Sequence, residues 1–137
     1  MRVSDMAVIK HSRQREAIKA NLMQRSDHPT ADMIYEDIRQ EYPNISLGTV
    51  YRNLSLLTDL GEIRKITTDS GADHYDGNLD PHIHFFCRAC GAILDLAPVD
   101  SEKLEKNTAE TFDGVIEETI VTFSGLCGWC AKEAGIR

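Results

Sequence analysis

Four cysteines are spaced in a way that suits one metal ion. They form two C-x-x-C pairs, Cys87 with Cys90 and Cys127 with Cys130. A gap of two residues lets both sulfur atoms of a pair face one ion, so two pairs supply the four thiolates of a closed tetrahedral zinc site. Such a site leaves no position for a substrate. The spacing therefore predicts structural zinc. A redox dithiol, unrelated core cysteines and an iron–sulfur cluster are the alternatives.

A second cluster offers imidazole and carboxylate ligands. His82 and His84 open a strand-like segment, where residues two apart share a face and can reach one ion. Asp76, Asp80 and Asp95 are the carboxylates nearby in the sequence. Mixed nitrogen and oxygen ligation favours Fe(II) or Mn(II) over an ion that prefers thiolates. The alternative is a pair of ordinary surface histidines.

Three helix-like segments occupy the first 60 residues. Ser12, Thr30 and Ser46 can each cap one of them. We expect the helices at about residues 12–23, 31–41 and 46–60. A buried stripe in the third helix comprises Val50, Leu54 and Leu57.

A basic β-hairpin is predicted next, from strand-like residues 63–67 and 74–76 around the turn residues Asp69, Ser70 and Gly71. Three helices followed by such a hairpin indicate a winged helix-turn-helix in residues 1–76. The alternative is a three-helix domain whose exposed arginine and tyrosine side chains only keep it soluble.

The second half is predicted to be a small α/β domain. Residues 77–81 contain glycine, asparagine and proline and are predicted to form a hinge. Residues 82–137 contain strand-like segments at 82–96 and 115–123 around a helix-like segment at 99–111. The fold class is therefore α+β. A unit of this size has too little core to stand alone, so it needs a metal ion, a second copy, or both.

Composition limits the functions the chain can have. It has 137 residues and a net charge of −7, with 10 basic against 11 acidic residues up to residue 75 and 5 against 11 beyond. An acidic protein does not attract DNA by its overall field, so a DNA-binding surface must be a local patch in the first half. There is no apolar run long enough for a membrane span, and the polar start does not resemble a secretory signal. We expect a cytoplasmic protein without a membrane partner.

Four motifs together resemble the ferric uptake regulator family across nearly the whole chain. They are His28-Pro29-Thr30-Ala31-Asp32, Thr49-Val50-Tyr51-Arg52-Asn53-Leu54, His82-Ile83-His84-Phe85-Phe86-Cys87-Arg88-Ala89-Cys90-Gly91 and Cys127-Gly128-Trp129-Cys130. The resemblance implies a metal-dependent homodimeric repressor, with an N-terminal winged helix and a C-terminal dimerisation domain, and not an enzyme. It implies structural Zn(II) on the four cysteines and regulatory Fe(II) or Mn(II) on His28, Asp76, His82, His84 and Asp95.

Asp95 favours one branch of that family. Iron-sensing members tend to carry Glu at this position, whereas Asp is similar to the peroxide-sensing repressors. Pro81 and Ile83 also stand where iron sensors often have His and Asp. The resemblance then implies that peroxide inactivates the repressor by iron-dependent oxidation of His28 and His82. An iron sensor without peroxide sensing is the alternative.

DNA binding is assigned to the third helix and to basic residues beside it. A dimer would place two such helices in successive major grooves, so we expect an inverted-repeat operator. The proposed contacts are Arg13, Arg15, Ser46, Thr49, Tyr51, Arg52, Arg64 and Lys65.

Two other classes of protein remain as alternatives. A small metallo-oxidoreductase would use the His/Asp cluster as a catalytic centre, but oxidation of its own ligands would not turn over. A zinc-ribbon interaction module would leave the first 75 residues unexplained. His11 and His74 are interpreted as surface histidines, and the sequence does not separate Asp76 from Asp80 as a ligand.

Overall fold

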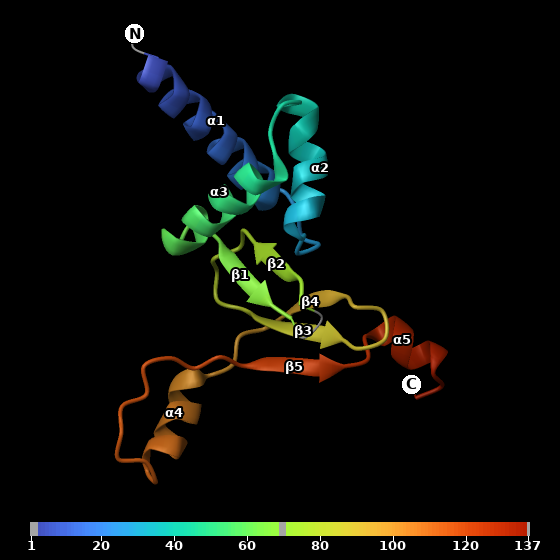
Figure 1. Cartoon of the computed structure of the whole chain (residues 1–137). Coiled ribbons are helices and arrows are strands. Elements are labelled where there is room, and N and C mark those ends of the chain that lie inside the picture. The colour runs from blue at the N-terminus through green and yellow to red at the C-terminus, as the bar shows by residue number, and fades with distance from the viewer. Residues whose placement is uncertain (1–2, 69–70, 137) are drawn as a thin grey trace. The chain divides into compact units, whose positions relative to one another are not determined.

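The chain forms two compact units, residues 1–79 and 80–137. The computed structural model describes residues 3–68 and 71–136, with the side chains of the first helix from residue 13 onward. In this part of the chain three helices are followed by four strands and then by a helix, a strand and a helix, which confirms the α+β fold class (Figure 1). No helix in this described part is long and apolar enough to span a membrane.

The first unit packs three helices and a hairpin around one core. Its elements are α1 (Val3–Met23), α2 (Ala31–Glu41), α3 (Leu47–Asp59), β1 (Arg64–Thr67) and β2 (Asp73–Asp76). The predicted stripe of α3 is fully buried, and it packs with Ile18 and Leu22 of α1 and Ile34 of α2. β1 and β2 pair antiparallel, with Ile66 opposite His74.

Helix caps fix two of the three helix starts as predicted. The hydroxyl of Thr30 accepts from the Met33 N–H and that of Ser46 accepts from the Thr49 N–H, so each satisfies an N–H at the start of α2 or α3. The predicted start at Ser12 is wrong, because α1 begins at Val3. No helix breaker separates residues 3–11 from the rest, so a serine within that run does not start a new helix. Within the predicted hairpin turn, Asp69 and Ser70 lie outside the described residues.

The second unit is a three-stranded sheet with two short helices. Its elements are β3 (Ile83–Cys87), β4 (Ile93–Leu96), α4 (Ser101–Ala109), β5 (Thr122–Gly125) and α5 (Gly128–Glu133). β3 lies in the centre, antiparallel to β4 and parallel to β5 (Figure 1). The strand predicted at 115–123 is wrong over most of its length. Thr122 lies opposite His84, the second residue of β3, so residues 115–120 have no β3 residue to pair with.

This second unit buries few side chains. Its buried apolar residues among those described are Cys87, Ile93, Cys130 and Ala131. Leu94 and Leu96 on β4 and Phe123 on β5 are exposed, and α4 has no buried residue. Three of the four buried positions therefore belong to the two cysteine motifs or adjoin them.

Candidate metal centres

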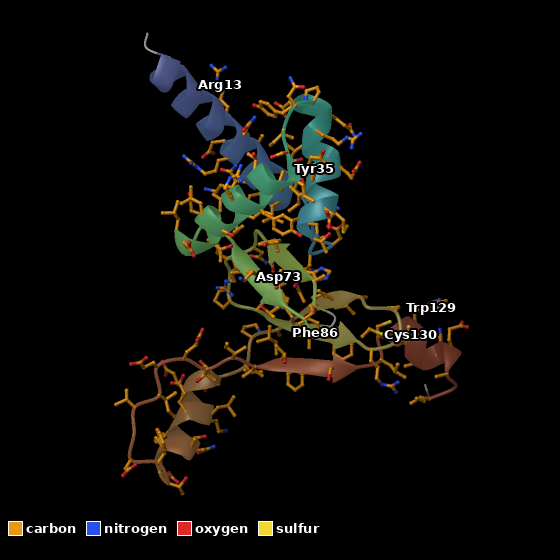
Figure 2. All side chains as sticks on the ribbon, in the orientation of Figure 1. Arg13, Tyr35, Asp73, Phe86, Trp129 and Cys130 are labelled. Carbon is orange, nitrogen blue, oxygen red and sulfur yellow. The ribbon has the colours of Figure 1, made fainter. Side chains whose placement is uncertain are left out.

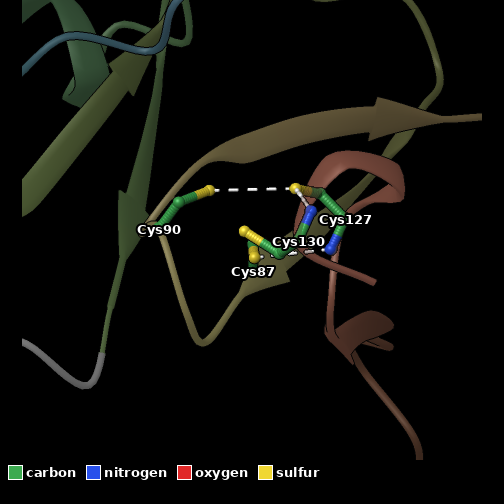
Figure 3. A group of neighbouring side chains, drawn as sticks. All are labelled: Cys87, Cys90, Cys127 and Cys130. Carbon is green, nitrogen blue, oxygen red and sulfur yellow. Dashed lines mark hydrogen bonds between the residues drawn. The ribbon is translucent and has the colours of Figure 1, made fainter. Parts of the chain in front are cut away.

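The four cysteines come together at one end of the second unit (Figure 3). Cys87 ends β3, Cys90 follows in the adjoining turn, Cys127 caps α5 and Cys130 lies within α5. Their sulfur atoms all lie within 4.8 Å of one another. Zinc bound tetrahedrally by thiolates at about 2.3 Å needs sulfur atoms about 3.8 Å apart. The separation of Cys90 Sγ and Cys127 Sγ is 3.8 Å.

Backbone hydrogen bonds hold these two motifs in place. The Gly91 N–H donates to the Cys87 carbonyl at 3.0 Å, and Gly91 adopts a φ of 75°, which a residue with a side chain rarely takes. The Arg88 N–H donates to the Gly125 carbonyl at 2.8 Å and so joins the first motif to the end of β5. Figure 2 shows Cys130 beside the exposed Trp129 at this end of the unit.

The thiols differ in their readiness to ionise. The Cys127 N–H donates to Cys87 Sγ at 3.3 Å, and this bond is the main cause that lowers the pKa of Cys87 to about 6. Burial is the main cause that raises the pKa of Cys130 to about 12. Four adjacent thiolates repel one another, so a bound cation is needed to ionise them all. The donor set and its spacing fit a structural zinc ion.

His82, His84 and Asp95 form a second group within the same unit. His84 lies opposite Asp95 in the register of β3 and β4. The two Nε2 atoms lie 3.0 Å apart, and Asp95 Oδ1 lies 3.5 Å from that of His82 and 3.6 Å from that of His84. His82 Nδ1 donates to the Asp80 carbonyl at 2.6 Å, which leaves Nε2 with a lone pair directed at the group. Asp80 thus contributes its backbone here.

His28 and Asp76 meet within the first unit. His28 Nε2 lies 3.4 Å from Asp76 Oδ2, and the two side chains are only 3% and 6% exposed. Asp76 ends β2, and its Oδ1 accepts from the Asn78 N–H at 2.9 Å. His28 has a φ of 51°, which is uncommon for a residue other than glycine. Each unit therefore carries its own group of imidazole and carboxylate side chains.

The contact that His74 makes was not indicated by the sequence. It is half-buried, and its Nδ1 donates to the His28 carbonyl at 2.7 Å. Side chains two apart in a strand share a face, so the position of Asp76 was a signal that His74 points the same way. The side chain of His11 lies outside the described part of the structure.

The outward face of α3 carries an ordered polar network. Ser46 Oγ and Thr49 Oγ1 lie 2.9 Å apart, and Arg52 Nη2 donates to Thr49 Oγ1 at 3.0 Å. Tyr51 is 44% exposed on the same helix. These residues lie on the side of α3 away from its buried stripe, or on the flanks of that stripe.

The remaining basic candidates are spread over α1 and β1. Arg13 projects from α1 (Figure 2) and is exposed. Arg15 is partly buried. Arg64 and Lys65 are exposed on β1. Arg64 Nη2 donates to the Leu79 carbonyl at 3.0 Å, so part of its guanidinium is already engaged within the first unit.

Comparison with known proteins identifies the family. The model of the ferric uptake regulator family matches residues 7–123. The chain belongs to the ferric uptake regulator family. Its members are metal-responsive transcriptional regulators that bind DNA as dimers, and they are not enzymes.

Individual relatives of the family agree in sequence and in fold. The peroxide-responsive repressor PerR of Staphylococcus epidermidis is 32% identical over 120 residues, which cover 88% of this chain and 80% of that protein. The solved structure of the Campylobacter jejuni peroxide stress regulator is 30% identical, with a TM-score of 0.75, and covers 95% of this chain and 100% of that one. The Helicobacter pylori ferric uptake regulator matches in fold, with a TM-score of 0.76 at 24% identity over 92% of this chain and 87% of that one.

Proposed function

We propose that this family member is a peroxide-sensing, metal-dependent repressor. In this proposal it binds an inverted-repeat operator as a homodimer when Fe(II) or Mn(II) is bound, and peroxide inactivates the iron form. It would act in the cytoplasm, as other repressors of this family do. The similarity to peroxide-responsive relatives supports this branch of the family.

A single regulatory ion would use both imidazole and carboxylate groups. The ligands would be His28 and Asp76 from the first unit and His82, His84 and Asp95 from the second. Three nitrogen and two carboxylate donors suit Fe(II) or Mn(II). His82, His84 and Asp95 would supply two imidazoles and one carboxylate, a set that can hold Fe(II) with open positions, and His28 and Asp76 would complete the coordination. An ion that requires both sets of ligands would favour one arrangement of the two units, which is the basis of a switch.

Asp95 is the observation that carries the choice of peroxide sensing. Its carboxylate lies in register with His84 on the neighbouring strand and faces both imidazoles of the second unit. Residue 95 is Asp, the residue type of the peroxide-sensing branch. Asp is one methylene shorter than the Glu that iron sensors tend to carry at this position. The alternative is iron sensing alone.

The four-cysteine site would hold zinc for the stability of the second unit. The unit has few buried apolar residues, and Cys87 and Cys130 are two of them. A zinc ion that joins β3 to α5 would supply the cross-link that this small core lacks.

Dimerisation would cover the apolar surface of the second unit. Large exposed side chains occur on its sheet, on α4 and in the following loop, and they are Leu94, Leu96, Leu104, Phe112, Val115, Ile120 and Phe123. Because members of this family form dimers, the proposed partner is a second copy of this chain. We assign residues 1–76 to a winged-helix DNA-binding domain, 77–81 to a hinge and 82–137 to dimerisation and metal binding.

DNA recognition would use the outward face of α3. Ser46, Thr49, Tyr51 and Arg52 lie there or beside it, and Arg52 is held by a neutral hydroxyl that leaves its charge available. Tyr51 suits a thymine methyl group and Arg52 a guanine edge or a phosphate. Arg13, Arg15, Arg64 and Lys65 would contact phosphates.

The response to peroxide would alter the ligands themselves. Bound ferrous iron would supply the electrons that reduce hydrogen peroxide beside the imidazole rings. The O–O bond of the peroxide would break, one oxygen atom would be added to the ring of His28 or His82, and the other would leave as water. An oxidised imidazole is a poorer electron-pair donor. The ligand set would then lose its affinity for the ion, the two units would no longer be joined, and the operator would be released.

Peptide mass measurement after peroxide treatment tests this function. We expect the iron-loaded protein, exposed to micromolar hydrogen peroxide, to gain one oxygen on peptides containing His28 or His82 and to lose operator binding in a gel-shift titration. The manganese-loaded protein is the matched control and should keep both its mass and its binding. If the iron-loaded protein binds DNA in a metal-dependent way but its peptides stay unmodified, iron sensing is correct and peroxide sensing is not.

A further inference from the structure

His74 lies outside the proposed ligand set but contacts the backbone of one of its members. Its Nδ1 lies 2.7 Å from the carbonyl oxygen of His28, 46 residues earlier in the sequence. A carbonyl oxygen only accepts, so the His74 ring must carry its proton on Nδ1 for this bond. The contact lies entirely within the first unit.

The backbone that His74 contacts has an unusual conformation. His28 has a φ of 51°, and a residue with a side chain persists in this region only when its surroundings hold it there. Two further contacts with β2 hold the same segment. The Tyr75 N–H donates to the Pro29 carbonyl at 2.9 Å, and Thr30 forms an antiparallel bridge with His74.

The alternation of β2 places the two contacts to His28 on one face. His74 and Asp76 are two residues apart, whereas Tyr75 between them is buried in the hydrophobic core. Asp76 Oδ2 lies 3.4 Å from His28 Nε2, and His74 Nδ1 lies 2.7 Å from the His28 carbonyl. One strand face therefore contacts His28 at both its ring and its backbone.

We propose that His74 is a positioning residue for the regulatory metal site, because it holds the His28 backbone in the conformation that directs the imidazole toward Asp76. This inference rests on the proposed function, in which His28 is a metal ligand. His74 does not itself bind the ion. Loss of a group that orients a ligand commonly weakens metal affinity by about 10- to 100-fold.

Three substitutions of His74 separate a positioned donor from simple packing. His74→Asn keeps an N–H donor close to the position of Nδ1, His74→Gln moves the donor about one bond further out, and His74→Phe keeps a ring without a donor. We expect Mn(II) affinity, measured by titration calorimetry on the full zinc-loaded protein, to fall about tenfold or more in the Gln and Phe variants. The Asn variant should stay within about threefold of the parent protein. Equal losses in all three variants, or no loss in the Gln and Phe variants, would overturn the positioning role.

Controls distinguish this inference from the function on which it rests. Zinc content should be unchanged in all His74 variants, because the four cysteines lie in the other unit. His28→Ala should itself weaken Mn(II) binding, and adding His74→Phe to that variant should weaken it little further. If His28→Ala leaves Mn(II) affinity unchanged, the proposed metal site is wrong. If only the His28 variant loses affinity, the metal site stands and His74 has no positioning role.

Discussion

The side chains that face outward from α3 are hydrogen-bonded to one another. Thr49 Oγ1 accepts from Arg52 Nη2 at 3.0 Å and lies 2.9 Å from Ser46 Oγ, whose hydroxyl also caps the helix. A long arginine side chain loses much rotational freedom when it binds, so a contact that restrains it beforehand reduces that loss. The Thr49 hydroxyl should therefore favour operator binding by restraining Arg52, in addition to its own proposed contact with DNA.

Removal of that hydroxyl should weaken specific binding. Thr49→Val keeps the branched shape of the side chain, and we expect the affinity of the manganese-loaded protein for its operator to fall about tenfold, because a well-placed arginine contact is worth about 1–3 kcal/mol. Fluorescence anisotropy with operator and scrambled DNA measures the change. Thr58→Val is the matched control, since the Thr58 hydroxyl donates to the Leu54 carbonyl of its own helix. Operator affinity equal to that of the parent protein would exclude this role for Thr49.

Contacts between residues were predictable from the sequence where a local motif defines them, and not where they join distant segments. The spacing of the two C-x-x-C pairs predicts that their four sulfur atoms lie close together, and in the structure they do. The contact of His74 with His28 was not predicted, because it joins residues 46 positions apart through a segment that lies along β2. The left-handed backbone of His28 has no sequence signal comparable to a glycine.

At the scale of elements, helices with a cap and a buried stripe were predictable. α2 and α3 begin immediately after Thr30 and Ser46, and the stripe of α3 is buried as its spacing requires. Strand β5 was predicted at the wrong place, because its length depends on the extent of β3 and not on its own β-branched residues. Which residues of two strands pair depends on the tertiary structure and cannot be read from the β-propensity of either segment.

The stripe of α3 should dominate the stability of the first unit. Leu54 is fully buried in the core, so Leu54→Ala should lower the free energy of unfolding by about 2–5 kcal/mol. Urea denaturation followed by circular dichroism measures this change. Leu56→Ala on the same helix is the control, because Leu56 is 39% exposed and its loss should cost about 0.5 kcal/mol or less. Equal effects of the two substitutions would contradict the packing described for α3.

At the scale of the whole molecule, the two units have different sources of stability. The first has a continuous hydrophobic core, and the second has a small one built around its cysteines. Membership of the ferric uptake regulator family shows that this chain is a metal-responsive regulator. We further propose that one ion takes ligands from both units, which would make the occupancy of the metal site and the arrangement of the DNA-binding surface a single equilibrium.

Anomalous X-ray scattering from crystals of the manganese-loaded, zinc-containing homodimer tests this claim most directly. We expect one manganese peak per chain in direct coordination with His28 and Asp76 of the first unit and with His82, His84 and Asp95 of the second. Zinc should occupy only the four-cysteine site. A manganese ion bound by the ligands of one unit alone, with the other group left uncoordinated, would contradict the account.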